Sequence, residues 1–148
     1  MSIASAAHSP ASTRPGRVAT QRVVVHGVVA GAIALTVIEA YAALAKTAGV
    51  PLRAGLPDTH TASLITAGSF ATGILVAAFW GTVVALVLAR NAVRPVRTFT
   101  RVAVTATALS LITPLAAFGA SLSTKLTLVA AHLIAATIMT TVLRRGIS

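Results

Sequence analysis

The chain has 148 residues, of which 56% are hydrophobic and only 9% charged, and its formal net charge is +10. This number of charged side chains is too small to cover the surface of a soluble domain. The composition therefore excludes an ordinary soluble protein. The basic residues lie in short gaps between long apolar runs, which argues against nucleic-acid binding and is typical of membrane topology signals.

The chain begins with a polar segment, residues 1–22, that is rich in Ser, Ala, Thr, Pro and Arg and shows no helical or strand period. Such a segment predicts a disordered basic cytoplasmic tail. The first apolar run follows at 23–45, interrupted only by His26 and Glu39. As a helix it would extend roughly 34 Å, which is enough to cross a hydrocarbon core of about 30 Å.

A cleaved signal peptide is an alternative interpretation of this first run. Its core would be residues 23–38, and Ala40-Tyr41-Ala42 resembles a small-residue cleavage site. The apolar stretch is long for a signal peptide, and Glu39 is unusual in one. Cleavage would leave three membrane helices in place of four, with the same orientation.

Three further membrane helices are predicted, at residues 64–89, 102–120 and 126–143. The segment 47–57 holds two Gly and two Pro and is predicted as a loop, with Asp58 or Thr59 capping the helix that follows. The segment 90–101 contains four Arg and is predicted as a tight basic turn.

Pro114 lies inside the third apolar run, where a proline removes a backbone donor and kinks a helix. This helix is expected to end near Gly119, because glycine readily adopts the conformation that follows a helix. Ser121 or Ser123 is expected to begin the next helix.

The predicted fold is therefore all-α, an integral membrane bundle of four transmembrane helices over residues 23–145. Nine basic residues lie on the side of the two termini and three on the other side. This bias predicts that both termini are cytoplasmic and that the protein is a multi-pass protein of a bacterial inner membrane. The topology-determining residues of the central turn are Arg90, Arg94, Arg97 and Arg101.

Glu39 is the single carboxylate within any predicted span, and burying its charge in hydrocarbon costs about 2.5–3.5 kcal/mol. We expect it to face the bundle, to be paired or to be protonated. His132 is its candidate partner, because both residues lie about 9 Å inside the same membrane boundary. Three interpretations stay open: a structural hydrogen bond, a proton- or ligand-handling site, or no contact.

The helix face around Glu39 carries Ala32, Thr36, Ala42 and Ala43, small residues that suit close contact with another helix. A GxxxG pattern lies partly to the side of this face, formed by Gly27 and Gly31.

Other signatures of chemistry are missing from the sequence. The chain has no cysteine, so it has no disulfide and no thiolate metal site. The four histidines lack metal-ligand spacing, and no phosphate-binding loop or paired carboxylates occur. We therefore expect no catalytic, cofactor-binding or metal site and no enzymatic activity. Trp80 lies at mid-membrane depth, where packing within the bundle is the expected role.

Short motifs occur in the last three predicted spans, over about residues 61–145: Leu88-Ala89-Arg90, Arg94-Pro95, Thr98-Phe99, Ser110-Leu111, Pro114-Leu115 and Ala131-His132-Leu133. With these motifs the chain resembles a family of uncharacterised four-helix membrane proteins of actinobacteria, known as a domain of unknown function. The resemblance implies a membrane protein and no established activity. An origin in a high-GC bacterium agrees with the predominance of Arg over Lys.

Four spans with one glutamate in the first are also similar to small multidrug exporters, through Ile38-Glu39-Ala40 and Lys46. The remaining spans do not match those exporters.

Our leading hypothesis is a non-enzymatic accessory or structural membrane component. The alternative is a small proton-coupled transporter that uses Glu39. The expected partners are the lipid bilayer and other membrane helices, from a second copy of the chain or from another membrane protein, and not nucleic acid.

Overall fold

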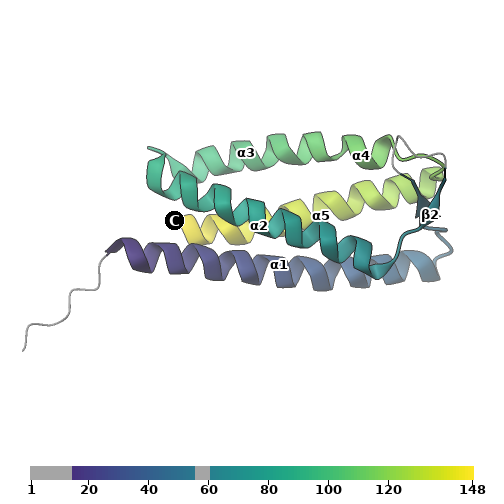
Figure 1. Ribbon diagram of the computed structural model, residues 1–148, viewed down its shortest axis with the longest axis horizontal. Coiled ribbons are helices and arrows are strands. Elements are labelled where there is room, and N and C mark those ends of the chain that lie inside the picture. Colours follow the sequence, from purple (N-terminus) through teal and green to yellow (C-terminus); the bar gives the residue numbers. More distant parts are fainter. Residues whose placement is uncertain (1–14, 56–60) are drawn as a thin grey trace, which may run out of the picture.

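The computed structural model of the chain describes residues 15–55 and 61–148. Long antiparallel helices lie side by side along one axis, as Figure 1 shows. The elements in chain order are α1 (Pro15–Thr47), β1 (Arg53–Ala54), β2 (Ser63–Leu64), α2 (Ala67–Asn91), α3 (Pro95–Ser110), α4 (Ile112–Leu115) and α5 (Leu122–Ile147). Four stretches of the described chain are long and apolar enough to cross a membrane: Thr20–Thr47, Gly68–Asn91, Pro95–Leu115 and Leu122–Ile147.

The helices pack as a ring. α1 contacts α2 and α5 most extensively, and α3 completes the ring by contacting the same two helices. The packed stripe of α1 repeats every three or four residues and includes Val23, Ala30, Ala34 and Ile38, all buried. Glycines allow close approach within it, because a Cβ on Gly31 would come within 3.1 Å of the Ala78 Cβ. The core is therefore built mainly around α1.

The first helix begins at Pro15, eight residues before the expected start at residue 23. A proline fits the first turn of a helix because its fixed φ angle is already helical. The turns that follow are tied to the rest of the bundle: the Arg22 guanidinium donates to the Arg145 carbonyl oxygen (3.1 Å), and the Arg90 guanidinium donates to the Thr20 hydroxyl (3.0 Å). The expected tail thus contributes helix from Pro15 onward, and residues 1–14 lie outside the described part.

The turn between α2 and α3 is shorter than the expected segment 90–101. α2 continues to Asn91, and α3 begins at Pro95 with Arg94 at its N-cap position. Proline is favoured at this first helical position because the N–H of any residue there has no partner within the helix. The N–H that proline lacks is therefore not missed. Arg97 and Arg101 consequently belong to the first two turns of α3 rather than to the loop.

The third apolar run is broken at Leu111, between α3 and the single-turn α4. Pro114 has no N–H to donate to the Ser110 carbonyl, so the regular hydrogen-bond ladder cannot continue through this point. α4 ends at Leu115, four residues before Gly119, which lies in the following connection with φ +64°. The Ser121 hydroxyl then accepts from the Thr124 amide (3.2 Å) and caps α5, as the sequence predicts.

A small antiparallel pair of strands covers the end of the bundle opposite the termini. β1 and β2 pair Arg53 with Leu64 and Ala54 with Ser63. Gly55 and Phe118 exchange two backbone hydrogen bonds, of 2.9 and 3.1 Å, which join this pair to the connection between α4 and α5. The expected caps of α2, Asp58 and Thr59, lie outside the described residues, and Thr66 occupies the N-cap position.

Candidate functional site

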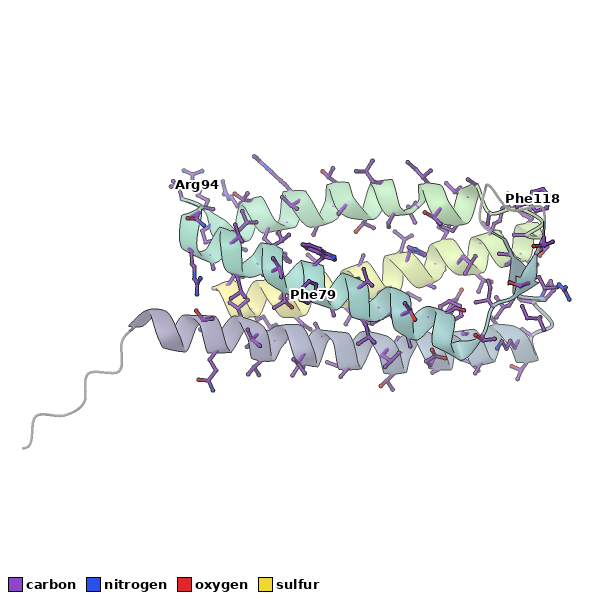
Figure 2. All side chains as sticks on the ribbon, in the orientation of Figure 1. Phe79, Arg94 and Phe118 are labelled. Carbon is purple, nitrogen blue, oxygen red and sulfur yellow. The ribbon has the colours of Figure 1, made fainter. Side chains whose placement is uncertain are left out.

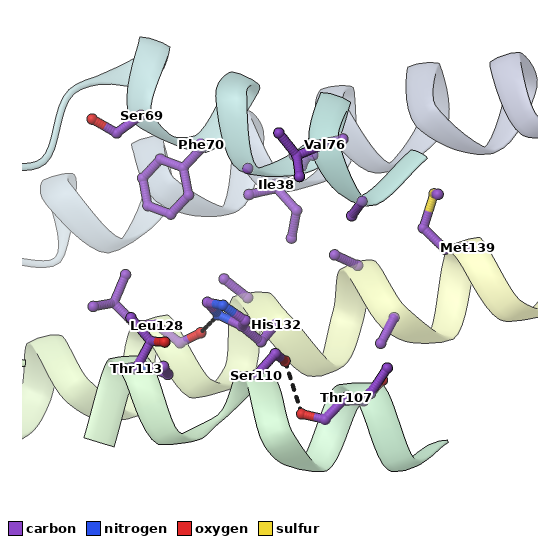
Figure 3. A pocket seen from close by; sticks show the side chains of 18 of the residues that line it. Ile38, Ser69, Phe70, Val76, Thr107, Ser110, Thr113, Leu128, His132 and Met139 are labelled. Carbon is purple, nitrogen blue, oxygen red and sulfur yellow. Dashed lines mark hydrogen bonds between the residues drawn. The ribbon is translucent and has the colours of Figure 1, made fainter. Parts of the chain in front are cut away.

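A cleft of about 940 Å³ lies between α2, α3 and α5, with Ile38 of α1 at its floor (Figure 3). On α2 its lining runs from Ser69 to Val84, and on α5 from Leu128 to Leu143. Fifteen residues of helix correspond to about 22 Å, so the cleft is elongated along the bundle axis. Its size is within the range of small-molecule sites, about 300–1,000 Å³.

Small side chains on all three helices leave this space unfilled. Side chains of ordinary core size would close it, because protein interiors normally pack without voids larger than a water molecule. The small residues that line the cleft are Gly73, Ala77 and Gly81 on α2, Ala103 and Ala106 on α3, and Ala131, Ala135 and Ala136 on α5.

The cleft opens sideways between α2 and α3. Val76 and Trp80 on α2 line it and are 54% and 59% exposed, and Val102 on the facing helix lines it and is 40% exposed. Figure 1 shows α2 beside α3 at their connecting turn and crossing away from it toward the other end of the bundle. This divergence leaves the two walls apart along much of the cleft.

Trp80 is exposed rather than packed inside the bundle, which corrects the expectation from its mid-membrane depth. Its indole ring meets the Phe79 ring edge to face, with 5.3 Å between the ring centroids. The labelled Phe79 of Figure 2 extends from the middle of α2. The indole ring of Trp80, which lines the cleft, is thus in contact with a neighbouring aromatic ring outside the lining.

His132 is the titratable side chain among the residues that line the cleft. Its Nδ1 lies 2.8 Å from the Leu128 carbonyl oxygen, one turn earlier on α5. Because a carbonyl oxygen accepts only, Nδ1 donates, and in the neutral ring Nε2 is left with a lone pair. Among the described residues no hydrogen bond of Nε2 to another side chain is present, so this acceptor is free within the cleft.

Two hydroxyl groups of α3 also line the cleft, but both already donate hydrogen bonds to backbone carbonyl groups of their own helix. The Ser110 hydroxyl donates to the Thr107 carbonyl oxygen (2.8 Å), and the Thr107 hydroxyl donates to the Ala103 carbonyl oxygen (2.8 Å). Figure 3 draws Ser110 and Thr107 beside each other on α3, across the cleft from α2. Neither hydrogen is available to His132.

Glu39 does not line the cleft. It is half-buried on α1, one residue beyond Ile38, and therefore about 100° around the helix from the cleft floor. Within the described residues no hydrogen bond or ion pair joins Glu39 to His132. Of the small residues predicted for this face of α1, Ala42 is buried, whereas Ala32, Thr36 and Ala43 are exposed. Gly27 and Gly31 make close contacts on another side of the helix.

The basic residues gather at the two ends of the bundle. One end holds the start of α1, the α2–α3 turn and the end of α5, with Arg22, Arg90, Arg94, Arg97, Arg101, Arg144 and Arg145. Arg94 is labelled at this end in Figure 2. The other end holds Lys46, Arg53 and Lys125, and the Lys125 ammonium there donates to the Leu115 carbonyl oxygen (2.9 Å).

Across the described residues, no group of three His, Cys, Asp or Glu side chains lies close enough to hold a metal ion. The cleft is thus mostly apolar, and among the described residues its histidine, His132, offers an unpaired acceptor at Nε2. The sequence singled out His132 by its predicted depth in a membrane, but it did not predict the cleft. The sequence did contain a signal for the cleft: glycine and alanine recur at helical spacing in three separate spans.

The chain was compared with known proteins. The model of one protein family, described as a family of unknown function, matches residues 18–148. The match includes α1, which the short motifs in the last three spans do not cover. No curated protein and no solved structure matches the chain.

Proposed function

The chain belongs to the family of unknown function DUF6069, and from that premise we propose that it is a non-enzymatic accessory component of a bacterial cell membrane. In this proposal the four long helices cross the bilayer and both termini lie in the cytoplasm. The protein acts by binding hydrophobic partners within the bilayer. The strong preference for Arg over Lys supports an actinobacterial source.

The observation that carries the proposal is the apolar surface between the two charged ends. Large hydrophobic side chains are exposed on every long helix, for example Val28 (69%), Leu75 (64%), Val104 (63%) and Leu126 (59%). Monomeric soluble proteins rarely expose continuous apolar surface of this extent, because each Å² left in water costs about 25 cal/mol. A bilayer removes that cost, since lipid tails are as apolar as these side chains.

The charge distribution supports the orientation. The arginine-rich end holds the start of α1, the end of α5 and the α2–α3 turn, whereas the other end holds Lys46, Arg53 and Lys125. Cytoplasmic segments of membrane proteins carry the excess of Lys and Arg.

The geometry favours binding over proton-coupled transport. A transporter carboxylate must face the path of its substrate. Glu39 lies outside the cleft lining, while the cleft itself holds His132 as its titratable group. The exposed small residues around Glu39 suit packing against a helix of another membrane protein, which would also shield the carboxyl group from lipid.

Reporter fusions test the proposal. Alkaline phosphatase, which is active outside the cytoplasm, is expected to be active when inserted after Val50 and inactive when inserted after Ala92 or fused after Ser148. Green fluorescent protein fused after Ser148 is expected to fluoresce. The opposite pattern, or release of the protein from membranes by alkaline carbonate, would contradict the proposal.

A further inference from the structure

The cleft between α2, α3 and α5 contains a free hydrogen-bond acceptor, the Nε2 atom of His132. We propose that this cleft binds one long-chain lipid that carries a hydroxyl group. The lipid enters sideways from the bilayer between α2 and α3 and donates a hydrogen bond from its hydroxyl group to Nε2. The proposal rests on the membrane insertion proposed above.

The shape of the cleft favours one extended chain. It runs for about 22 Å along α5, from Leu128 to Leu143, and its walls are mostly hydrocarbon side chains. A compact ligand would leave much of that length empty. A single alkyl or isoprenoid chain lying parallel to the helices would contact the small residues of all three walls.

The arrangement of the helices argues against a fifth helix as the occupant. α3 contacts both α2 and α5, so the cleft opens between helices that still touch each other. A helix with its side chains is about 10 Å across, and its entry would separate α3 from the bundle. An alkyl chain is much thinner and can pass between Trp80 and Val102 at the opening.

The chemistry of His132 selects a donor on the lipid. Nδ1 already donates to the Leu128 carbonyl, so Nε2 of the neutral ring can only accept. The Thr107 and Ser110 hydroxyls on the facing helix donate within α3 and do not satisfy it. Because most of the surrounding wall is apolar, a hydroxyl that bonds to Nε2 gains a specific position in the cleft.

Trp80 supplies the measurement, because it is the one tryptophan of the chain and it lines the cleft. The full chain is reconstituted in phosphatidylcholine vesicles and titrated with dibromostearyl alcohol, whose bromines quench nearby tryptophan. We expect saturable quenching. The methyl ether of the same alcohol, which lacks the donor, is expected to bind roughly 2- to 10-fold more weakly.

Two pairs of variants sharpen the test. His132→Leu is expected to remove the preference for the alcohol over the ether, whereas His132→Gln, which keeps an acceptor, retains part of it. Ala106→Phe fills the cleft and should abolish saturation. Ala108→Phe is the matched control, because Ala108 is exposed on the same helix but does not line the cleft.

Equal binding of alcohol and ether by the unmodified chain would overturn the proposal, and so would saturation that Ala106→Phe leaves unchanged. Flotation of the same vesicles separates this failure from a failure of the proposed function. Protein that floats with the vesicles but shows no saturable quenching contradicts the lipid site alone. Protein that does not float contradicts membrane insertion itself.

Discussion

Gly27 lies at a close contact between α1 and α2. A Cβ atom at this position would collide with the Thr82 hydroxyl oxygen, which in turn donates to the Ala78 carbonyl oxygen (2.7 Å). The hydroxyl therefore occupies the space that the glycine leaves open. One turn later, Gly31 continues the same contact against Ala78.

We predict that Gly27→Ala lowers the free energy of unfolding by about 1–3 kcal/mol, because the added methyl group overpacks this contact. Combining it with Thr82→Ala should restore most of the loss, since the colliding hydroxyl is then gone. Thermal unfolding in detergent micelles measures both. Gly73→Ala is the control, because a Cβ there meets nothing within 4 Å. An equal loss in the control would contradict the prediction.

The contact face of α1 shows how far the sequence of an apolar helix predicts which of its faces packs against other helices. The sequence favoured the face around Glu39, whereas the structure packs the face of Gly27 and Gly31. In a soluble protein, polarity would mark the outer face. In the proposed membrane setting, lipid and core are both apolar, so hydropathy cannot distinguish them. For the same reason, the sequence could predict that Glu39 and His132 lie at equal depth, but it could not predict whether their side chains face each other.

The helices themselves were the most predictable elements, because long apolar runs have few alternatives in a chain of this composition. Their ends were less predictable. Hydropathy marks the part of a helix that suits lipid, while hydrogen bonding decides where the helix stops. α1 therefore extends back to Pro15, and α3 begins at Pro95 within the predicted turn. Strands β1 and β2 have two residues each, too few for an alternating pattern to identify.

At the start of α5, the Ser121 hydroxyl accepts from the Thr124 amide. We predict that Ser121→Ala destabilises the protein by about 1 kcal/mol, because the first turn loses its cap. Ser121→Asp should keep most of the stability, since its carboxylate can accept the same hydrogen bond. The midpoint of thermal unfolding, followed by circular dichroism in detergent, distinguishes the two. Equal destabilisation by both substitutions would show that the cap does not matter here.

At the scale of the molecule, orientation is expected to depend on the α2–α3 turn. Replacing Arg90, Arg94, Arg97 and Arg101 with Gln lowers the nine basic residues of the proposed cytoplasmic side to five, against three opposite. We predict a mixed orientation, measured by alkaline phosphatase activity of a fusion at Ser148, because the charge bias becomes weak. Replacing Lys46, Arg53 and Lys125 with Gln is the control and should leave the orientation unchanged. A fully retained orientation in the four-residue variant would contradict this dependence.

The cleft also arises from the arrangement of several helices together, and this is why the sequence did not predict it. Each wall contributes small residues that, taken alone, are ordinary contact residues of a membrane helix. The space appears because α2 crosses away from α3 while α3 still contacts α5. Crossing angles of this kind depend on packing among all the helices, which no single segment encodes.

The largest interface joins the first helix to the last, where Gly146 of α5 packs against His26 and Val23 of α1. α5 follows the other long helices in the chain, so it is made after α1. The surface of α1 around Val23 and His26 therefore lacks its partner until α5 has been made. In the proposed membrane setting, we expect a chain that stops before Leu122 to leave this surface uncovered and the bundle incomplete.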